Sequence, residues 1–277
     1  MTPTLRLVFK TLDSVAPTLA AHRIYHFMAN PRSGKLRDFE LEVLEKAKKE
    51  DFKFEDFSIR KYKWGKSTKR VLCVHGWEGQ GANFGGIVNT LLEKGFEVIT
   101  FDGPSHGFSS KGKTNWYDYI QLTTKMALEY QPEIIISHSF GSVASATMLR
   151  NNPDLKIKQW FLITSPHDVK ERIKDFSQPL GVTNRTISKL IPLLESDTGE
   201  HIDNLNMSTF CADLKNVPEA FIVHGTGDKI LPIKISEKIH KDFPQSELIE
   251  LEGLGHYRIL WSESKRITID LFHSANH

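Results

Sequence analysis

From Arg70 onward, short apolar runs alternate with segments of helical periodicity, and this alternation limits the possible folds more than any other feature. The apolar runs are nearly continuous, as in "RVLCVH" (70–75), "EIIIS" (133–137) and "EAFIVHG" (219–225). Strands that are apolar on both faces are typical of a parallel sheet covered by helices on both sides. We therefore predict an α/β fold with a mostly parallel, twisted sheet. Ligands of such sheets bind beyond the carboxyl ends of the strands.

The remaining segments from Arg70 onward follow the same rhythm. We expect further strands over 96–102, 158–164 and 246–253. We expect helices over 84–95, 115–130, 141–152 and 233–243, and a last helix from about Glu263.

The first 64 residues do not show this alternation of strand and helix patterns. Residues 12–28 predict a helix interrupted at Pro17, and residues 37–50 predict a short charged helix. The aromatic and β-branched residues of 54–64 favour a hairpin or an edge strand. We therefore predict a helical N-terminal extension over 1–50 that packs on the core.

The stretch between the strands at 158–164 and 219–225 is longer than a simple crossover needs. It contains "VKERIKDF" and "ISKLIPLLES", and an apolar helical face is formed by Ile187, Leu190, Ile191 and Leu194. We predict a helical cap insertion over 167–214 and an α/β core formed by 51–166 and 215–277. The alternative is one long crossover helix followed by a loop.

Composition excludes several classes of protein. The 277 residues are 39% hydrophobic and 25% charged, which supplies a globular core. The net charge of +2 indicates no nucleic-acid partner, and the basic run at 60–70 is interpreted as the solvated face of a strand. No apolar window is long enough to span a membrane. The two cysteines, Cys73 and Cys211, are far apart and show no spacing typical of disulfides, which favours a reducing, cytoplasmic location. Monomer and homodimer both stay open.

Ser139 lies where the apolar run at 133–137 gives way to a helical segment. Small residues surround it, including Ser137 and Gly141. A sharp strand–helix turn that raises a nucleophile above the sheet requires small residues two positions before and after it. The following helix would direct its N-terminal N–H groups toward the same point. The alternative is a serine that caps the helix.

The chain from Arg70 onward resembles the α/β-hydrolase superfamily, in its bacterial serine hydrolase and esterase-like branch. The resemblance rests on "HGWEGQG", "FDGPSHGFS", "SHSFG", "HGTGDKILP" and "GLGHYRIL". The elbow of the family is G-x-S-x-G, and Ser137 replaces its first glycine here. The order Ser…Asp…His is also that of the family.

The resemblance implies that Ser139 is the nucleophile, His256 its base and Asp228 the carboxylate that orients the base. Asp228 follows a buried strand, and its alternative role is that of a turn or capping residue. His256 lies in a loop with two glycines after the last strand. The other histidines near strand ends are interpreted as structural: His75, His106, His138 and His224.

An acyl-transfer mechanism also requires two backbone N–H groups that bind the oxyanion. Phe140 follows the nucleophile and Trp77 follows "HG" after the first parallel strand, so these two are the candidates. The glycine-rich loop near Trp77 does not match a nucleotide-binding pattern. We expect no cofactor and no metal.

The expected function is that of a serine hydrolase, a carboxylesterase that cleaves small or medium acyl esters through an acyl-enzyme. The substrate would be a small-molecule ester, and the expected lining residues of its pocket are Phe84, Phe108, Ile187, Leu190 and Ile191. A thioesterase, carbon–carbon hydrolase, peptidase or acyltransferase would use the same residues. A binding protein without turnover is the alternative from another class.

Overall fold

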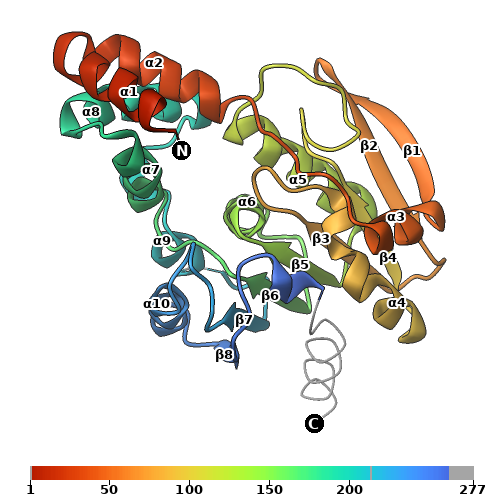
Figure 1. Cartoon of the computed structure of the whole chain (residues 1–277). Coiled ribbons are helices and arrows are strands. Elements are labelled where there is room, and N and C mark those ends of the chain that lie inside the picture. The colour runs from red at the N-terminus through yellow and green to blue at the C-terminus, as the bar shows by residue number, and fades with distance from the viewer. Residues whose placement is uncertain (1, 213, 262–277) are drawn as a thin grey trace.

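A single eight-stranded sheet forms the centre of the protein, for which the computed structural model describes residues 2–212 and 214–261 (Figure 1). The order of the strands is β1-β2-β4-β3-β5-β6-β7-β8. Their bounds are β1 Lys48–Phe54, β2 Phe57–Trp64, β3 Arg70–Val74, β4 Glu97–Phe101, β5 Ile134–His138, β6 Gln159–Ile163, β7 Glu219–Gly225 and β8 Ser246–Leu251. Strands β3 to β8 run parallel, while β1 and β2 form an antiparallel hairpin at one edge.

The helices connect and cover these strands. Their bounds are α1 Pro3–Val15, α2 Pro17–Met28, α3 Asp38–Glu45, α4 Gly85–Glu93, α5 Trp116–Tyr130, α6 Phe140–Asn151, α7 Val169–Ser177, α8 Asn184–Thr198, α9 Met207–Cys211 and α10 Lys234–Asp242. None of the helices in residues 2–212 and 214–261 is both long and apolar enough to cross a bilayer.

Two hydrophobic layers sandwich the sheet because its central strands are apolar on both faces. In β3, Leu72 and Val74 belong to the layer shared with α5 and α6, whereas Val71 and Cys73 belong to the layer shared with α3 and α4. All four are fully buried. Burying a large aliphatic side chain contributes about 1.5–3 kcal/mol, so the continuous apolar runs fix the sheet between the two helical layers. The predicted α/β fold and its parallel sheet are confirmed.

Helices α7, α8 and α9 occupy the chain between β6 and β7, where a helical insertion is expected. The N-terminal helix α2 packs along α8, and Figure 1 shows α1, α2 and α8 together at one end of the molecule. Tyr25 of α2 donates a hydrogen bond to the Asp197 carboxylate of α8, with O–O distances of 2.7 and 2.8 Å. The division into extension, core and cap remains a prediction.

Two expected boundaries need correction. The helix expected over 37–50 ends at Glu45, and Lys48–Phe54 is strand β1 instead. Lysine and glutamate favour a helix locally, but pairing with β2 outweighs that preference at an exposed sheet edge. The N-terminal helix begins at Pro3 rather than near residue 12, and Pro17 starts α2. The helix expected from Glu263 lies outside the described residues.

Candidate active site

Ser139 occupies a sharp turn between β5 and α6. Its backbone angles are φ 50° and ψ −123°, a combination that residues with a side chain rarely adopt. Its N–H donates to the Ile163 carbonyl oxygen at 2.9 Å, which ties the turn to the end of β6. Such a conformation costs about 1–3 kcal/mol and persists only where the surroundings impose it. The serine side chain is partly exposed at the carboxyl edge of the sheet.

Close backbone contacts explain the small residues near this turn. A Cβ atom at Gly141 would lie 2.3 Å from the carbonyl oxygen of Val74 and 2.6 Å from that of His75. A Cβ atom at Gly76 would lie 3.0 Å from the Cβ atom of Ser139. Only glycine fits at position 141, because backbone atoms of β3 approach it on the side where a side chain would be.

Ser137, which replaces the first glycine of the family's elbow, has a structural role of its own. Its Oγ accepts a hydrogen bond from the Trp160 indole N–H at 2.9 Å and donates to the Phe161 carbonyl oxygen at 3.0 Å. Trp160 is fully buried, so its N–H needs an acceptor inside the core. The departure from glycine therefore supplies that acceptor and leaves the turn intact.

Asp228 and His256 form a buried pair beyond the ends of β7 and β8. The distance between His256 Nδ1 and Asp228 Oδ2 is 2.7 Å. The other carboxylate oxygen accepts the N–H groups of Ile230 and Leu231 at 2.7 and 2.9 Å. Burial raises the pKa of the Asp228 carboxyl, but the His256 contact and the two N–H groups outweigh it, so the net shift is downward. An ionised Asp228 holds the proton of His256 on Nδ1 and leaves Nε2 as the free nitrogen.

The described residues contain no hydrogen bond between Ser139 Oγ and His256. The two residues are nevertheless linked through His138, the neighbour of Ser139. His138 Nε2 lies 2.9 Å from the His256 carbonyl oxygen, and the two imidazole rings are 4.9 Å apart. Burial lowers the pKa of His138 to about 3, so it is neutral and Nε2 carries the donated proton. Sequence reasoning assigned His138 no link to the base, and only the fold brings the two together.

The loop after β3 is rigidly held on both sides of Trp77. His75 Nδ1 lies 2.7 Å from the Gly76 carbonyl oxygen, and the Glu78 N–H donates to His106 Nε2 at 3.2 Å. Burial lowers the pKa of His75 to about 4, which keeps its imidazole neutral. The peptide groups that flank Trp77 are therefore fixed by two buried histidines.

The backbone N–H groups of Trp77 and Phe140 are available for a ligand. Phe140 is the first residue of α6, where an N–H has no acceptor within the helix. Among the described residues, neither N–H donates a hydrogen bond. The two aromatic rings contact each other, with their centroids 5.6 Å apart. These positions are where the sequence predicts the two oxyanion donors.

A cavity of about 210 Å³ opens directly onto Ser139. Its walls are mostly apolar and come from α2, α7, the start of α5, the elbow at Ser139 and the loops after β3, β6 and β7. The lining residues are Phe27, Met28, Trp77, Glu78, Trp116, Ser139, Phe140, Pro166, Arg172, Ile173, Phe176, Ile230 and Leu231. Asp228 and His256 are buried and do not line this cavity. An apolar lining with few polar groups is typical of small-molecule sites.

None of the five side chains expected to line the substrate pocket lines this cavity. Phe84 and Leu190 are fully buried in the two hydrophobic layers. Ile187 and Ile191 also pack into the layer that includes α8, and Phe108 is 56% exposed on a loop. The apolar face of α8 is used for packing, which is the more common role of such a face. The cavity is lined instead by residues that include Phe27, Met28 and Phe176. They lie far from Ser139 in the sequence, and no sequence pattern points to them as pocket residues.

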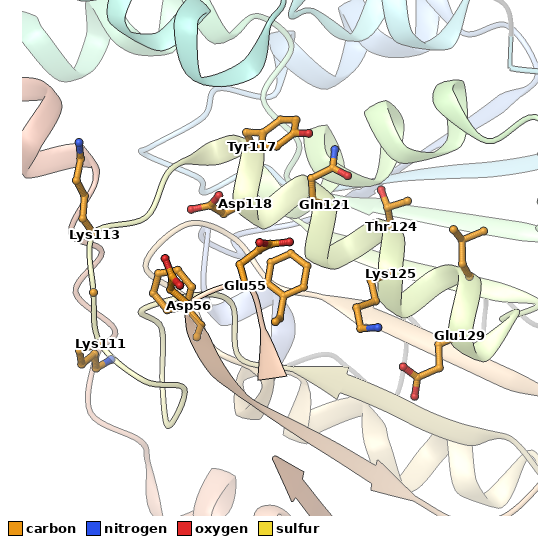
Figure 2. A pocket seen from close by; sticks show the side chains of 14 residues that line it. Glu55, Asp56, Lys111, Lys113, Tyr117, Asp118, Gln121, Thr124, Lys125 and Glu129 are labelled. Carbon is orange, nitrogen blue, oxygen red and sulfur yellow. The ribbon is translucent and has the colours of Figure 1, made fainter. Parts of the chain in front are cut away.

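A larger cavity of about 1230 Å³ lies apart from Ser139, between the β1–β2 turn and α5. Figure 2 shows charged side chains of both signs around it, among them Glu55, Asp118, Lys125 and Glu129. It contains none of the predicted catalytic residues and is open and polar, so it is not the candidate active site. No three His, Cys, Asp or Glu side chains gather as metal ligands within 2–212 and 214–261.

Comparison with known proteins agrees with this architecture. Residues 69–181 match the family described as "alpha/beta hydrolase fold". The chain is 22% identical over 237 residues to the uncharacterized hydrolase YugF of Bacillus subtilis, a match that covers 67% of this chain and 82% of that protein.

Two solved structures share the fold. The Pyrococcus furiosus esterase Pf2001 is 18% identical, with a TM-score of 0.62 and coverage of 89% of this chain and 95% of the esterase. The thioesterase domain from the curacin biosynthetic pathway is 17% identical, with a TM-score of 0.61 and coverage of 82% and 99%. The strand order, the matched region and these structural likenesses show that the chain has the α/β-hydrolase fold.

Proposed function

We propose that the chain is a serine hydrolase that cleaves carboxylic esters of small or medium acyl groups through an acyl-enzyme. The observation that carries this proposal is the strained turn at Ser139, open to an apolar cavity, beside the buried Asp228–His256 pair. A strained backbone persists where function requires it, and a turn of this kind exposes a nucleophile.

In the first half of the reaction, His256 Nε2 takes the proton of the Ser139 hydroxyl as Oγ attacks the ester carbonyl carbon. Asp228 stabilises the imidazolium that forms. The negative oxygen of the tetrahedral intermediate accepts the N–H groups of Trp77 and Phe140. Collapse of the intermediate releases the alcohol, which takes its proton from His256, and leaves the acyl group on Ser139.

In the second half, His256 removes a proton from water, and the resulting hydroxide attacks the acyl-enzyme. The same two N–H groups stabilise the second intermediate, and Ser139 recovers its proton as the acid leaves. The hydrogen bond between Ser139 and His256 must form when substrate binds. Catalytic hydrogen bonds often shorten only in that complex.

The cavity supports an acyl group of limited length. Its volume of about 210 Å³ is below the range of drug-sized pockets, which begins at roughly 300 Å³. The apolar rings of Trp116 and Phe140 form part of its wall, with centroids 5.4 Å apart. We expect nitrophenyl esters with short and medium acyl chains to react faster than long-chain esters. Comparison with matched acyl thioesters separates an esterase from a thioesterase.

The nucleophile is tested by labelling the folded protein with a fluorophosphonate and measuring the intact mass. We expect one label per chain, which disappears in Ser139→Ala. Turnover of nitrophenyl butyrate should fall by roughly three to six powers of ten in that variant, as when other triad members are removed. Folded wild-type protein that neither takes up the label nor hydrolyses any ester would overturn the proposal and favour a binding protein.

A further inference from the structure

His138 contacts the segment that carries the candidate base, although it belongs to the strand that carries the nucleophile. It is the last residue of β5 and the neighbour of Ser139. Its Nε2 atom lies 2.9 Å from the carbonyl oxygen of His256, and the centroids of the two imidazole rings are 4.9 Å apart. Only 4% of His138 is exposed, so the contact lies in the interior. It joins two parts of the candidate site that are 118 positions apart in the sequence.

The strand side of this contact is fixed to the sheet. His138 pairs with Ile163 of β6, and the N–H of Ser139 donates to the Ile163 carbonyl oxygen at 2.9 Å. The imidazole ring also lies close to Gly76, because a Cβ atom at that glycine would be 3.3 Å from His138 Nδ1. The sheet and the loop after β3 thus limit the positions that the His138 ring can adopt.

The loop that leads to His256 is not fixed by side-chain packing at its two glycines. A Cβ atom at Gly253 would meet no atom within 4 Å, and one at Gly255 would meet a single atom, 3.7 Å away. Gly253 also adopts a left-handed conformation, with φ 70°. The orientation of His256 therefore depends on the hydrogen bonds that the residue itself forms.

The acceptor in this contact determines which nitrogen of His138 carries the proton. A carbonyl oxygen only accepts hydrogen bonds, so Nε2 of His138 is the protonated nitrogen and donates. Burial lowers the pKa of His138 to about 3, which keeps the side chain neutral. A neutral donor places no second positive charge beside His256 when that imidazole takes up a proton. A lysine at position 138 would offer a donor as well, but its charge would disfavour the imidazolium.

We propose that His138 is a positioning residue that orients His256 toward Ser139 by donating a hydrogen bond to the His256 carbonyl oxygen. Asp228 holds the imidazole of His256 at Nδ1, and His138 holds its main chain. Two attachments restrict the pivoting of the ring that a single one would allow, so less ordering remains when substrate binds. His138 acts through His256 and not on the substrate. This inference rests on the proposed ester hydrolysis and adds to it the residue that orients the base.

Three substitutions separate the donor from the rest of the side chain. His138→Gln places an amide N–H as many bonds from Cα as Nε2 is in histidine, and should keep most of the turnover. His138→Asn carries the same amide on a side chain that is shorter by one methylene, and His138→Phe keeps a ring without a donor. For these two we expect kcat for nitrophenyl butyrate to fall by roughly a hundredfold, with KM unchanged. The rate of fluorophosphonate labelling should fall by a similar factor.

A merely structural role would lower stability without this pattern of rates. His167→Phe is the matched control, because His167 is a buried histidine outside the candidate site whose Nε2 lies 2.8 Å from Ser208 Oγ. We expect this variant to have a lower urea midpoint and a kcat close to that of the wild type. If His138→Phe does not fold by circular dichroism, the comparison of His138→Gln with His138→Asn is sufficient for the test.

A double variant tests whether the effect passes through His256. Asp228→Asn already removes the group that orients the imidazole. Because His138 and Asp228 act on the same residue, their effects should not add. We expect His138→Phe to reduce kcat clearly less in the Asp228→Asn background than in the wild type.

The contact is also measured without turnover, in protein labelled with nitrogen-15 histidine. Proton–nitrogen correlation spectra at neutral pH should show His138 as a neutral ring protonated at Nε2. They should also show a low-field Nδ1–H signal of His256, which reports its hydrogen bond to Asp228. We expect this signal to stay in His138→Gln and to broaden or disappear in His138→Phe, because the ring then exchanges between orientations.

Wild-type kcat and labelling rates in His138→Asn and His138→Phe would overturn the proposal and leave the proposed hydrolase function in place. Equal losses in His138→Gln and His138→Phe would also overturn it, because the donor would then not be the feature that matters. Protein that gives the expected histidine spectra, but takes up no label and hydrolyses no ester, would refute the proposed function while the His138–His256 contact stands.

Discussion

At the scale of single residues, the carboxylate of Asp228 determines which nitrogen of His256 is free. Its two oxygens are fully used by His256 Nδ1 and by two backbone N–H groups. Asp228→Asn keeps the shape but offers an amide, which removes the charge and favours the wrong tautomer of the imidazole. We expect turnover to fall by roughly four powers of ten with the fold intact.

The measurement is the rate of nitrophenyl ester hydrolysis, together with circular dichroism. His224 lies next to Asp228, with Nε2 3.8 Å from Oδ2, but it also contacts Ser236 and Leu231. His224→Gln is therefore the control and should change the rate much less. A nearly normal rate in Asp228→Asn would mean that another carboxylate orients the base.

A second residue-scale prediction concerns Ser137. Ser137→Ala leaves the buried indole N–H of Trp160 without an acceptor, which costs about 1–3 kcal/mol of unfolding free energy. Ser137→Gly, which recreates the family's own elbow, should lose at least as much. Urea unfolding followed by fluorescence measures both.

Ser145→Ala is the matched control, because Ser145 is a buried serine whose Oγ has no hydrogen-bond partner among the described residues. We expect this change to be neutral or stabilising. Ser137→Ala with wild-type stability would show that water or a rearranged side chain satisfies Trp160.

At the scale of elements, the N-terminal helices pack against α8 and form hydrogen bonds with it. Asp13 of α1 accepts hydrogen bonds from the N–H of Thr183, which caps α8, and from the Thr183 and Thr186 hydroxyls, at 2.7–3.0 Å. Helix α2 then carries Phe27 and Met28 into the wall of the cavity, and the Trp77 indole N–H donates to the Met28 carbonyl oxygen at 3.1 Å. The N-terminal helices are thus connected to the loop after β3.

Asp13→Ala should lower the free energy of unfolding by about 1–3 kcal/mol, since it leaves buried donors unsatisfied at the start of α8. We also expect KM for a nitrophenyl ester to rise more than kcat falls, because the wall of the cavity moves while the Asp228–His256 pair stays in place. Thr2→Ala removes an exposed cap of α1 and is the control. A loss of stability without any change in KM would mean that the packing of the N-terminal helices does not affect the cavity.

The sequence predicts some elements of the structure well and others poorly. Strands β3 to β7 were predictable because each contains a nearly continuous apolar run, as at Ile134–His138. Strand β8 was predicted although Glu247 and Glu250 interrupt its apolar residues. Strand β1 was not, because Lys48, Lys49 and Glu50 have no apolar pattern and only their pairing with β2 makes them a strand. Ser139, Asp228 and His256 could be proposed as candidates because each follows a strand at one sheet edge, and of these the structure brings Asp228 and His256 into contact. The cavity wall was not, because Phe27 and Phe176 meet near Ser139 only through the packing of distant helices.

At the scale of the whole molecule, buried neutral histidines make stability depend on pH. Burial lowers the pKa of His75 to about 4 and that of His138 to about 3, from an ordinary value of 6.5. Below pH 6.5 the unfolded chain binds protons that the native chain does not, so the stabilisation present above pH 6.5 is lost as pH falls toward 4. Each histidine contributes up to about 1.4 kcal/mol per pH unit in this window.

We expect the urea midpoint to fall steadily between pH 6.5 and 5, above the range in which most carboxylates titrate. The slope should decrease in His138→Gln, which removes one of the buried imidazoles. A midpoint that does not change over this range would mean that the buried histidines are protonated in the native state.

The contacts of the N-terminal helices also affect how the chain folds during translation. Asp13 and Tyr25 bind partners that are 170 and 172 residues further along the chain. When the first two helices leave the ribosome, their docking site has not been synthesised, so they must wait until the insertion follows. Attachment of the N-terminal helices is therefore a late step in biogenesis, and until then their apolar inner faces are available to chaperones.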